Sequence, residues 1–330
     1  VSSNTINGGD DGIYFDMSSS SSYSVRYNHI THNNISHVED DVIELEYSSY
    51  SKINDNRIIG GDYGIYTDSS SSKSFEYSEV LNNHLESLDR GIYLDYGDYG
   101  MVDNNTLMGC DEGLYIYYTD SAQISNNTVE ENLEEAIYVY NSDGNAIRDN
   151  MIERSIEEGI YVYSSDDNEV RNNTIKDCHE GGIYISSGSD NNYNENTLTR
   201  CGFYFGTSSS SYWTTNNINS DNKVNDREVY LKTNTNNLKI SKDVGQVLLY
   251  GCDGATLEDA EIEEATVGVQ LSYCDHAYIE NTTLGDQTWG IELYRSNYAG
   301  IKNCTISGNS VTGIVNEYSE AVHQLERVTD

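Results

Sequence analysis

Hydrophobic and polar residues alternate over short stretches along the whole chain. In the segment Gly159-Ile160-Tyr161-Val162-Tyr163, the aliphatic residues Ile160 and Val162 fall on one face and the two tyrosines on the other. A period of two residues is typical of β-strands, and helical spacing does not recur in any window of useful length. The pattern therefore predicts an all-β protein.

This strand pattern recurs at a nearly fixed period. It can be aligned on the residues Gly91, Gly113, Ala136, Gly159 and Gly182, which step by 22, 23, 23 and 23 residues. Each repeat offers only two or three inward-facing aliphatic residues, too few for a core of its own, so neighbouring repeats must stack. The sequence thus predicts a right-handed parallel β-helix of about 13 coils.

A second register follows each strand, with sequences such as Asn126-Asn127-Thr128-Val129 and Asn172-Asn173-Thr174-Ile175. Stacking places equivalent residues about 4.7–4.9 Å apart. We expect the asparagines to form a column of side-chain amides, each donating to and accepting from its neighbours. The glycine before each strand suits either a positive φ or a close backbone approach.

These coils resemble the NosD-like, carbohydrate-binding-and-sugar-hydrolase group of β-helix repeat proteins, which occur on archaeal and bacterial surfaces. The resemblance covers nearly the whole chain. A second match, 222–231 followed by 243–247, is similar to the insert that such chains carry between two blocks of coils. Because the coils resume after this insert, we expect one continuous solenoid, with N-terminal coils at 1–206, an insert or seam at 207–246 and C-terminal coils at 247–330. Neither end shows an evident cap, so we expect it to be part of a larger protein.

Charge and hydropathy restrict the partners and the location. The chain has 55 acidic and 18 basic residues, a net charge of −37, and such a surface repels phosphate backbones and anionic headgroups. We therefore expect no nucleic-acid partner. No stretch approaches the roughly 20 apolar residues of a membrane-spanning helix, so we expect no membrane insertion and a secreted or cell-surface location.

A column of tyrosines is predicted on the outer face of the N-terminal coils. Two interpretations carry equal weight: a surface that binds glycan or another copy of the chain, or cross-strand stacking that stiffens the sheet. The column comprises Tyr66, Tyr93, Tyr115, Tyr138, Tyr161, Tyr184 and Tyr204.

An acidic ridge is predicted beside this column. Rows of carboxylates repel one another and can bind Ca²⁺, although a merely solvated acidic edge is the favoured interpretation. The candidate Ca²⁺ ligands are Asp111, Glu112, Glu134, Glu135, Glu157, Glu158 and Glu180.

Four of the six cysteines form two pairs at coil spacing. Cys178 and Cys201 are 23 residues apart, and Cys252 and Cys274 are 22 apart, so each pair should lie on adjacent coils. Both disulfides and stacked free thiols agree with this spacing, and free thiols are slightly favoured because side chains in register point in parallel.

No catalytic constellation stands out in the sequence. The seven histidines fall on unrelated coil positions, and basic residues that would hold a uronate carboxylate are scarce. The first hypothesis is therefore a non-catalytic extracellular scaffold or filament segment, presenting the tyrosines and acidic ridge to glycan or to other copies of itself. The alternative hypothesis is a carbohydrate-active enzyme: a polysaccharide hydrolase, lyase or epimerase.

Overall fold

The computed structural model describes residues 1–15, 25–68, 76–240 and 242–325. The chain consists of parallel stacked coils, about 12 turns in all, and the described residues include one short helix. The predicted all-β parallel β-helix is confirmed. The coils belong to two compact units, Val1–Thr174 and Ile175–Asp330.

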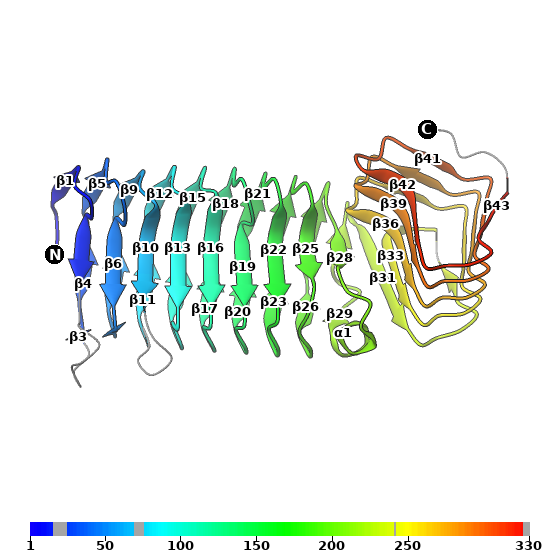
Figure 1. Cartoon of the computed structure of the whole chain (residues 1–330), viewed down its shortest axis with the longest axis horizontal. Helices are drawn as coiled ribbons and strands as arrows, with labels where there is room; N and C mark the ends of the chain where they lie inside the picture. The colour runs from blue at the N-terminus through cyan, green and yellow to red at the C-terminus, as the bar shows by residue number, and fades with distance from the viewer. Residues whose placement is uncertain (16–24, 69–75, 241, 326–330) are drawn as a thin grey trace. The chain divides into compact units, whose positions relative to one another are not determined.

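In the first unit, each complete coil contributes one strand to each of three parallel sheets (Figure 1). The first sheet contains β2 (Ile13–Phe15), β6 (Ile43–Glu46), β10 (Tyr63–Asp68), β13 (Arg90–Asp95), β16 (Glu112–Tyr117), β19 (Ile137–Tyr140) and β22 (Glu158–Tyr163). The second contains β4 (His29–Thr31), β8 (Lys52–Asn54), β11 (Glu79–Leu81), β14 (Met101–Asp103), β17 (Gln123–Ser125), β20 (Ala146–Arg148) and β23 (Glu169–Arg171). The third contains β1 (Thr5–Asn7), β5 (Asn34–Ser36), β9 (Arg57–Ile59), β12 (His84–Glu86), β15 (Thr106–Met108), β18 (Thr128–Glu130) and β21 (Met151–Glu153). A short parallel pair, β3 (Val25–Arg26) and β7 (Ser48–Ser49), lies outside these sheets, and β24 (Thr174–Lys176) begins where the first unit ends.

The second unit contains two groups of coils joined by a turn. The first group has β25 (Gly181–Ile185), β26 (Asn192–Asn194), β27 (Thr197–Thr199), β28 (Phe203–Phe205), α1 (Ser210–Thr215), β29 (Asn217–Ile218) and β30 (Lys223–Val224). β30 pairs antiparallel with β31 (Arg227–Thr233), after which the strands are parallel again. The longest sheet of the second group continues with β33 (Val244–Tyr250), β36 (Val267–Ser272), β39 (Trp289–Tyr294) and β42 (Thr312–Glu317). Its other sheets contain β32 (Lys239–Ile240), β34 (Thr256–Glu258), β37 (Tyr278–Glu280), β40 (Gly300–Lys302) and β43 (His323–Leu325), and β35 (Glu261–Glu263), β38 (Thr283–Gly285) and β41 (Thr305–Ser307).

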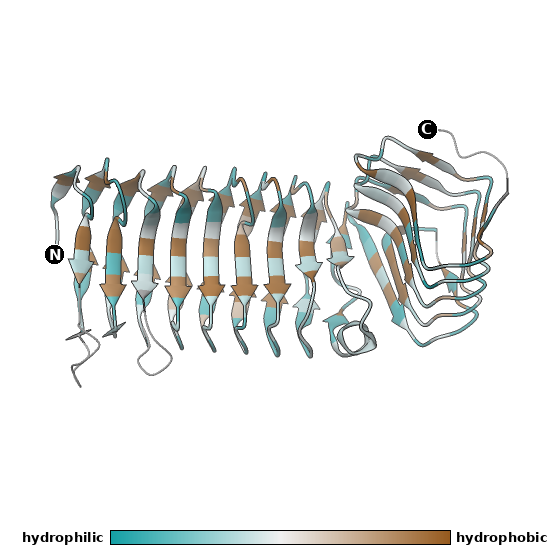
Figure 2. Ribbon diagram, in the orientation of Figure 1, coloured by the Kyte–Doolittle hydropathy of each residue, from teal (hydrophilic) through white to brown (hydrophobic). Residues whose placement is uncertain are grey.

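The core is a set of aliphatic columns inside the coils. Ile160 and Val162 of β22 are fully buried, whereas Tyr161 and Tyr163 are half-buried on the other face, as the alternation predicts. Figure 2 shows the same hydrophobic bands repeating from strand to strand. Space at the start of the strands is so tight that a Cβ on Gly64 would lie 2.6 Å from the carbonyl oxygen of Gly91, so close approach explains this glycine.

The predicted asparagine column is confirmed. It lies at the same bend in successive coils. In the pairs Asn82-Asn83, Asn104-Asn105, Asn126-Asn127 and Asn172-Asn173 the first residue adopts a positive φ, for example 54° at Asn126, which asparagine tolerates better than most residues. The second residue is buried. The Oδ1 of Asn127 accepts from the backbone N–H and the side-chain amide of Asn105, both at 3.0 Å, and its own amide donates to Asn150 Oδ1 and the Val102 carbonyl. The tight bend therefore leaves these groups paired although no water reaches them.

Side chains close the edge of β28 in the second unit. The amide of Gln246 accepts a hydrogen bond from Phe203 N–H at 2.9 Å and donates to the Phe203 carbonyl at 2.6 Å. Gln270 makes the same pair of bonds to Phe205, at 3.3 and 2.9 Å. Because a glutamine amide carries one acceptor and two donors, it substitutes here for the peptide group of a neighbouring strand.

Replacing Asn127 with Ala should destabilise the protein by about 2–4 kcal/mol, because the change leaves several buried donors and acceptors of the neighbouring coils unpaired. The measurement is the free energy of unfolding in urea. The control is Glu169→Ala on the exposed side of β23, which should change that energy by less than about 0.5 kcal/mol. Equal stability of the two variants would contradict this role of the column.

Candidate functional site

The tyrosine column forms as a ladder of rings that contact one another. Within the first unit, ring centroids are 5.3 Å apart for Tyr66 and Tyr93, 4.8 Å for Tyr93 and Tyr115, 4.8 Å for Tyr115 and Tyr138, and 5.0 Å for Tyr138 and Tyr161. The planes are edge-on in the first and third pairs, stacked in the second and tilted by 36° in the fourth, and all five side chains are half-buried. Since each ring lies against the next, ring–ring contact accounts for part of their burial. Tyr184 and Tyr204 continue the pattern within the second unit, at 5.2 Å.

One arginine lies at the head of the acidic ridge. The guanidinium of Arg90 forms an ion pair with Glu112 at 2.6 Å and lies over the rings of Tyr63, Tyr93 and Tyr115, 5.1–5.4 Å from their centroids. Glu112 is in register with Arg90 on the next strand. This contact links the ridge to the tyrosine ladder through charge and cation–π attraction.

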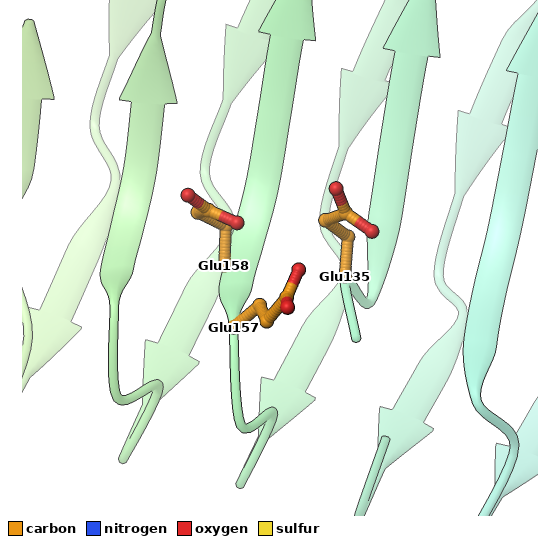
Figure 3. A group of neighbouring side chains, drawn as sticks. All are labelled: Glu135, Glu157 and Glu158. Carbon is orange, nitrogen blue, oxygen red and sulfur yellow. The ribbon is translucent and has the colours of Figure 1, made fainter. Parts of the chain in front are cut away.

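Three of the candidate Ca²⁺ ligands come together beyond this pair. Glu135, Glu157 and Glu158 each offer a carboxylate oxygen, and these oxygens lie within 4.8 Å of one another (Figure 3). Glu135 precedes β19, Glu157 precedes β22, and Glu158 is the first residue of β22. Hard oxygen donors in such an arrangement suit Ca²⁺ or Mg²⁺. Asp111 and Glu134 lie outside this group in the first unit, Glu112 is held by Arg90, and Glu180 lies in the second unit.

The crowding of acids shifts their protonation. Burial, followed by the charges of Glu157, Glu112 and Glu134, raises the pKa of Glu135 to about 7. Burial and the neighbouring carboxylates likewise raise the pKa of Asp41, in an earlier coil, to about 6. Both groups therefore bind a proton more tightly in the folded chain than in the unfolded one.

The sign of these shifts predicts a stability that falls as pH rises. The contribution of Glu135 to the free energy of unfolding is fully present below the pKa of about 4.5 that this group has in the unfolded chain. It is lost as the pH rises through about 7, the pKa in the folded chain. The melting temperature should therefore be higher at pH 5.5 than at pH 8, and Glu135→Gln should reduce that difference by raising the melting temperature at pH 8. A variant with the pH dependence of the unmodified chain would show that Glu135 is not part of the cause.

The cysteine pairs lie together as free thiols. The thiol of Cys201 contacts that of Cys178, and the backbone N–H of Cys252 donates to the sulfur of Cys274 at 3.3 Å, with the two sulfurs also in contact. All four are buried and unbridged. Each pair therefore lies in contact, as its spacing predicts, and the choice between thiols and disulfides stays a prediction.

A cleft in the second unit was not predicted from the sequence. It is a cavity of about 390 Å³ whose lining includes Tyr184, Tyr204, Trp289, Glu292, Tyr294 and Glu317. β39 positions Trp289, Glu292 and Tyr294, while β42 ends at Glu317. The ring of Trp289 stacks on Tyr204, with centroids 4.9 Å apart and planes 23° apart. The cleft thus combines an aromatic wall with two carboxylates.

Glu292 lies in a half-enclosed position within this cleft. Burial raises its pKa, and the charge of Glu317 raises it further, while hydrogen bonds from Gln270 and the Tyr204 hydroxyl act in the opposite direction. The Gln270 amide is 3.4–3.5 Å from the two carboxylate oxygens. The cleft therefore brings together a half-buried acid with a raised pKa, Glu292, and a second, exposed carboxylate, Glu317.

One sequence signal could have located this cleft. In the C-terminal coils, Gln270 and Glu292 occupy the strand position that tyrosine holds in earlier coils. In the structure this change marks the place where Gln270 closes the edge of β28 and Glu292 enters the cleft.

Comparison with known proteins identifies the family. The family model described as "Periplasmic copper-binding protein (NosD)" matches residues 1–164, 74–242 and 156–324. The chain belongs to the NosD family. No curated protein matches its sequence. None of the helices among the described residues is long and apolar enough to cross a membrane.

Several solved structures are similar to this NosD-family chain. The catalytic unit of a GH87 α-1,3-glucanase from Streptomyces thermodiastaticus is 10% identical, with a TM-score of 0.46, over 92% of this chain and 64% of that one. A GH87 α-1,3-glucanase catalytic domain in complex with tetrasaccharides is 14% identical, with a TM-score of 0.46, over 93% of this chain and 63% of that one. The A-module of the Azotobacter vinelandii mannuronan C-5 epimerase AlgE4 is 11% identical, with a TM-score of 0.46, over 90% of this chain and 88% of that one. This chain spans less than two thirds of the glucanase chains.

Proposed function

We propose that this chain is a secreted or cell-surface carbohydrate-active enzyme whose site is the cleft of the second unit. The observation that carries the proposal is the joint lining of one cavity by Tyr204, Trp289, Glu292 and Glu317. Aromatic side chains are suited to stacking on sugar rings, and paired carboxylates are the groups that most glycoside hydrolases use.

The chemistry follows from the different environments of the two acids. In this reaction Glu292, whose pKa is raised by burial, is the acid that donates a proton to the glycosidic oxygen as the bond to the sugar carbon breaks. Glu317 acts as the base: it takes one proton from a water molecule whose oxygen bonds to that carbon, so water supplies the hydroxyl group of the product. Because the chain carries a net charge of −37, we propose a neutral glycan as the substrate in place of a uronate polymer.

The non-catalytic hypothesis depends on the tyrosine ladder, which lies half-buried with its rings against one another. This contact favours stiffening over sugar stacking, because a ring face covered by the next ring is not free for a ligand. Binding of glycan or of a second copy along the ladder of the first unit stays an alternative proposal.

Glu292→Gln should lower the rate of hydrolysis of the cleaved glycan by about 10²–10⁴-fold, since the glutamine has no proton to donate, while the glycan still binds. Reducing-end release from a panel of neutral polysaccharides measures cleavage, and calorimetry measures binding. The control is Glu261→Gln, a change of the exposed acid at the start of β35. Binding without cleavage by the unmodified chain would support the scaffold hypothesis and remove the enzyme.

The description of the matched family names copper, so we compare the possible metal ligands of this chain with those that copper prefers. Copper(I) prefers soft sulfur ligands, whereas the Glu135, Glu157 and Glu158 group offers only hard oxygens. Among the described residues, the thiol pairs Cys178 with Cys201 and Cys252 with Cys274 offer two contacting soft donors each. These cysteines are the residues that would hold copper(I).

A further inference from the structure

A second hollow of the second unit adjoins the cleft. It has a volume of about 470 Å³ and is lined by Tyr273, Asp275, Arg295, Asn297, Tyr318 and Glu320. Three strands that are neighbours in one sheet, β36, β39 and β42, are followed directly by Tyr273, Arg295 and Tyr318 (Figure 1). The same strands end in Ser272, Tyr294 and Glu317, which line the cleft. Consecutive residues of three successive coils therefore line the two hollows.

The backbone after these strands keeps consecutive side chains on the outer surface. Arg295 has a φ of 46°, and Tyr273 and Tyr318 have φ values of 53° and 54°. In this left-handed conformation the alternation of faces along the strand ends. The guanidinium carbon of Arg295 accordingly lies 5.6 Å from the ring centroid of Tyr294, the residue directly before it. Tyr294 is therefore a shared wall, which lines the cleft and contacts the arginine of the second hollow.

Arg295 keeps most of its hydrogen-bond donors available. Its guanidinium carbon lies 5.6–5.8 Å from the ring centroids of Tyr273, Tyr294 and Tyr318. Among the residues that the structure describes, the guanidinium makes one hydrogen bond, to the Tyr273 hydroxyl at 3.4 Å, and no ion pair. Arg90 in the first unit also lies over three tyrosine rings, but it is paired with Glu112 at 2.6 Å. A guanidinium carries five N–H donors, so tyrosine rings hold Arg295 in place while its donors remain for a ligand.

Hydrogen bonds fix a row of polar groups in the same hollow. Asp275 Oδ1 accepts from the backbone N–H of Asn297 at 2.7 Å, and Asn297 Oδ1 accepts from the backbone N–H of Glu320 at 2.9 Å. The hollow thus combines aromatic rings, a planar guanidinium, carboxylates and an amide. Aromatic rings pack against the C–H face of a sugar, and a guanidinium can donate to two neighbouring oxygens at once.

We propose that this hollow is a subsite for a further sugar residue of the glycan that occupies the cleft, an inference that rests on the proposed function. Arg295 donates to the oxygens of two neighbouring hydroxyl groups, and the ring of Tyr318, which is 76% exposed, packs against the sugar. Asp275 and Glu320 give the lining a net negative charge, which favours an uncharged sugar over a uronate. The substrate is therefore a neutral polysaccharide chain that extends beyond the two residues joined by the cleaved bond.

The experiment compares the binding of long and short glycans by calorimetry. The probes are the hexasaccharides and disaccharides of α-1,4-glucan, β-1,3-glucan, β-1,4-glucan and β-1,4-mannan, titrated into Glu292→Gln so that cleavage does not interfere. We expect one hexasaccharide to bind about 10-fold or more tightly than its disaccharide. Arg295→Lys, which keeps the charge but not the planar pair of donors, and Tyr318→Ala should each remove most of this difference and leave disaccharide binding unchanged.

The chain offers matched controls for both changes. Arg148→Lys alters an exposed arginine of the first unit, and Tyr298→Ala removes an exposed ring that stacks on His276 and lines neither hollow. Both controls should keep the full preference for the hexasaccharide, and melting temperatures verify that each variant is folded.

The outcomes separate the subsite from the proposed function. Equal binding of the two lengths, or a full preference for the hexasaccharide in Arg295→Lys and Tyr318→Ala, would overturn the subsite, even if the unmodified chain cleaves the glycan. A preference that both variants lose, without cleavage by the unmodified chain, would support the subsite and refute the hydrolase. Absence of binding by every probe would overturn both.

Discussion

Stacking of one coil on the next, at the spacing of paired β-strands, is the constraint on which every other feature of this chain depends. A coil contributes too few aliphatic side chains to form a core alone, so its interior exists only between neighbours. The same spacing repeats any side chain at a given position about every 4.8 Å. Whether that repetition stabilises or destabilises depends on the side chain: amides such as Asn127 bond in chains, tyrosine rings stack, and glutamates repel.

The acidic ridge shows how the chain accommodates repulsion. Arg90 offsets the charge of Glu112 at one end, and beyond it Glu135 retains a proton near neutral pH. A cation would serve the same purpose at Glu135, Glu157 and Glu158. The ridge therefore has three ways to relieve its charge: an internal cation, a bound proton or an ion from solution.

The fold was predictable because its signals are local and repeated. Alternation identified Ile160 and Val162 as core, and the Asn-Asn pairs identified the amide column, since each signal occurs in coil after coil. The cleft was not predictable, because it depends on single residues that interrupt the pattern. The repeat pattern does not predict a site at Trp289 and Glu292, and only the structure shows that both contact Tyr204. The cluster of three carboxylates was only partly predictable. The spacing of the acids predicts the ridge, but only the side-chain directions in the structure show that Glu135, Glu157 and Glu158 come together.

The glutamines that close the edge of β28 have an evolutionary consequence. Gln246 and Gln270 join two groups of coils through side chains, so the join does not require the backbones of the two groups to match strand for strand. A gene duplication that adds or removes a coil far from this join would leave both glutamines and the cleft beside them unchanged. Repeat number and cleft can therefore diversify separately, and a lineage can alter the length of the protein without remaking its site.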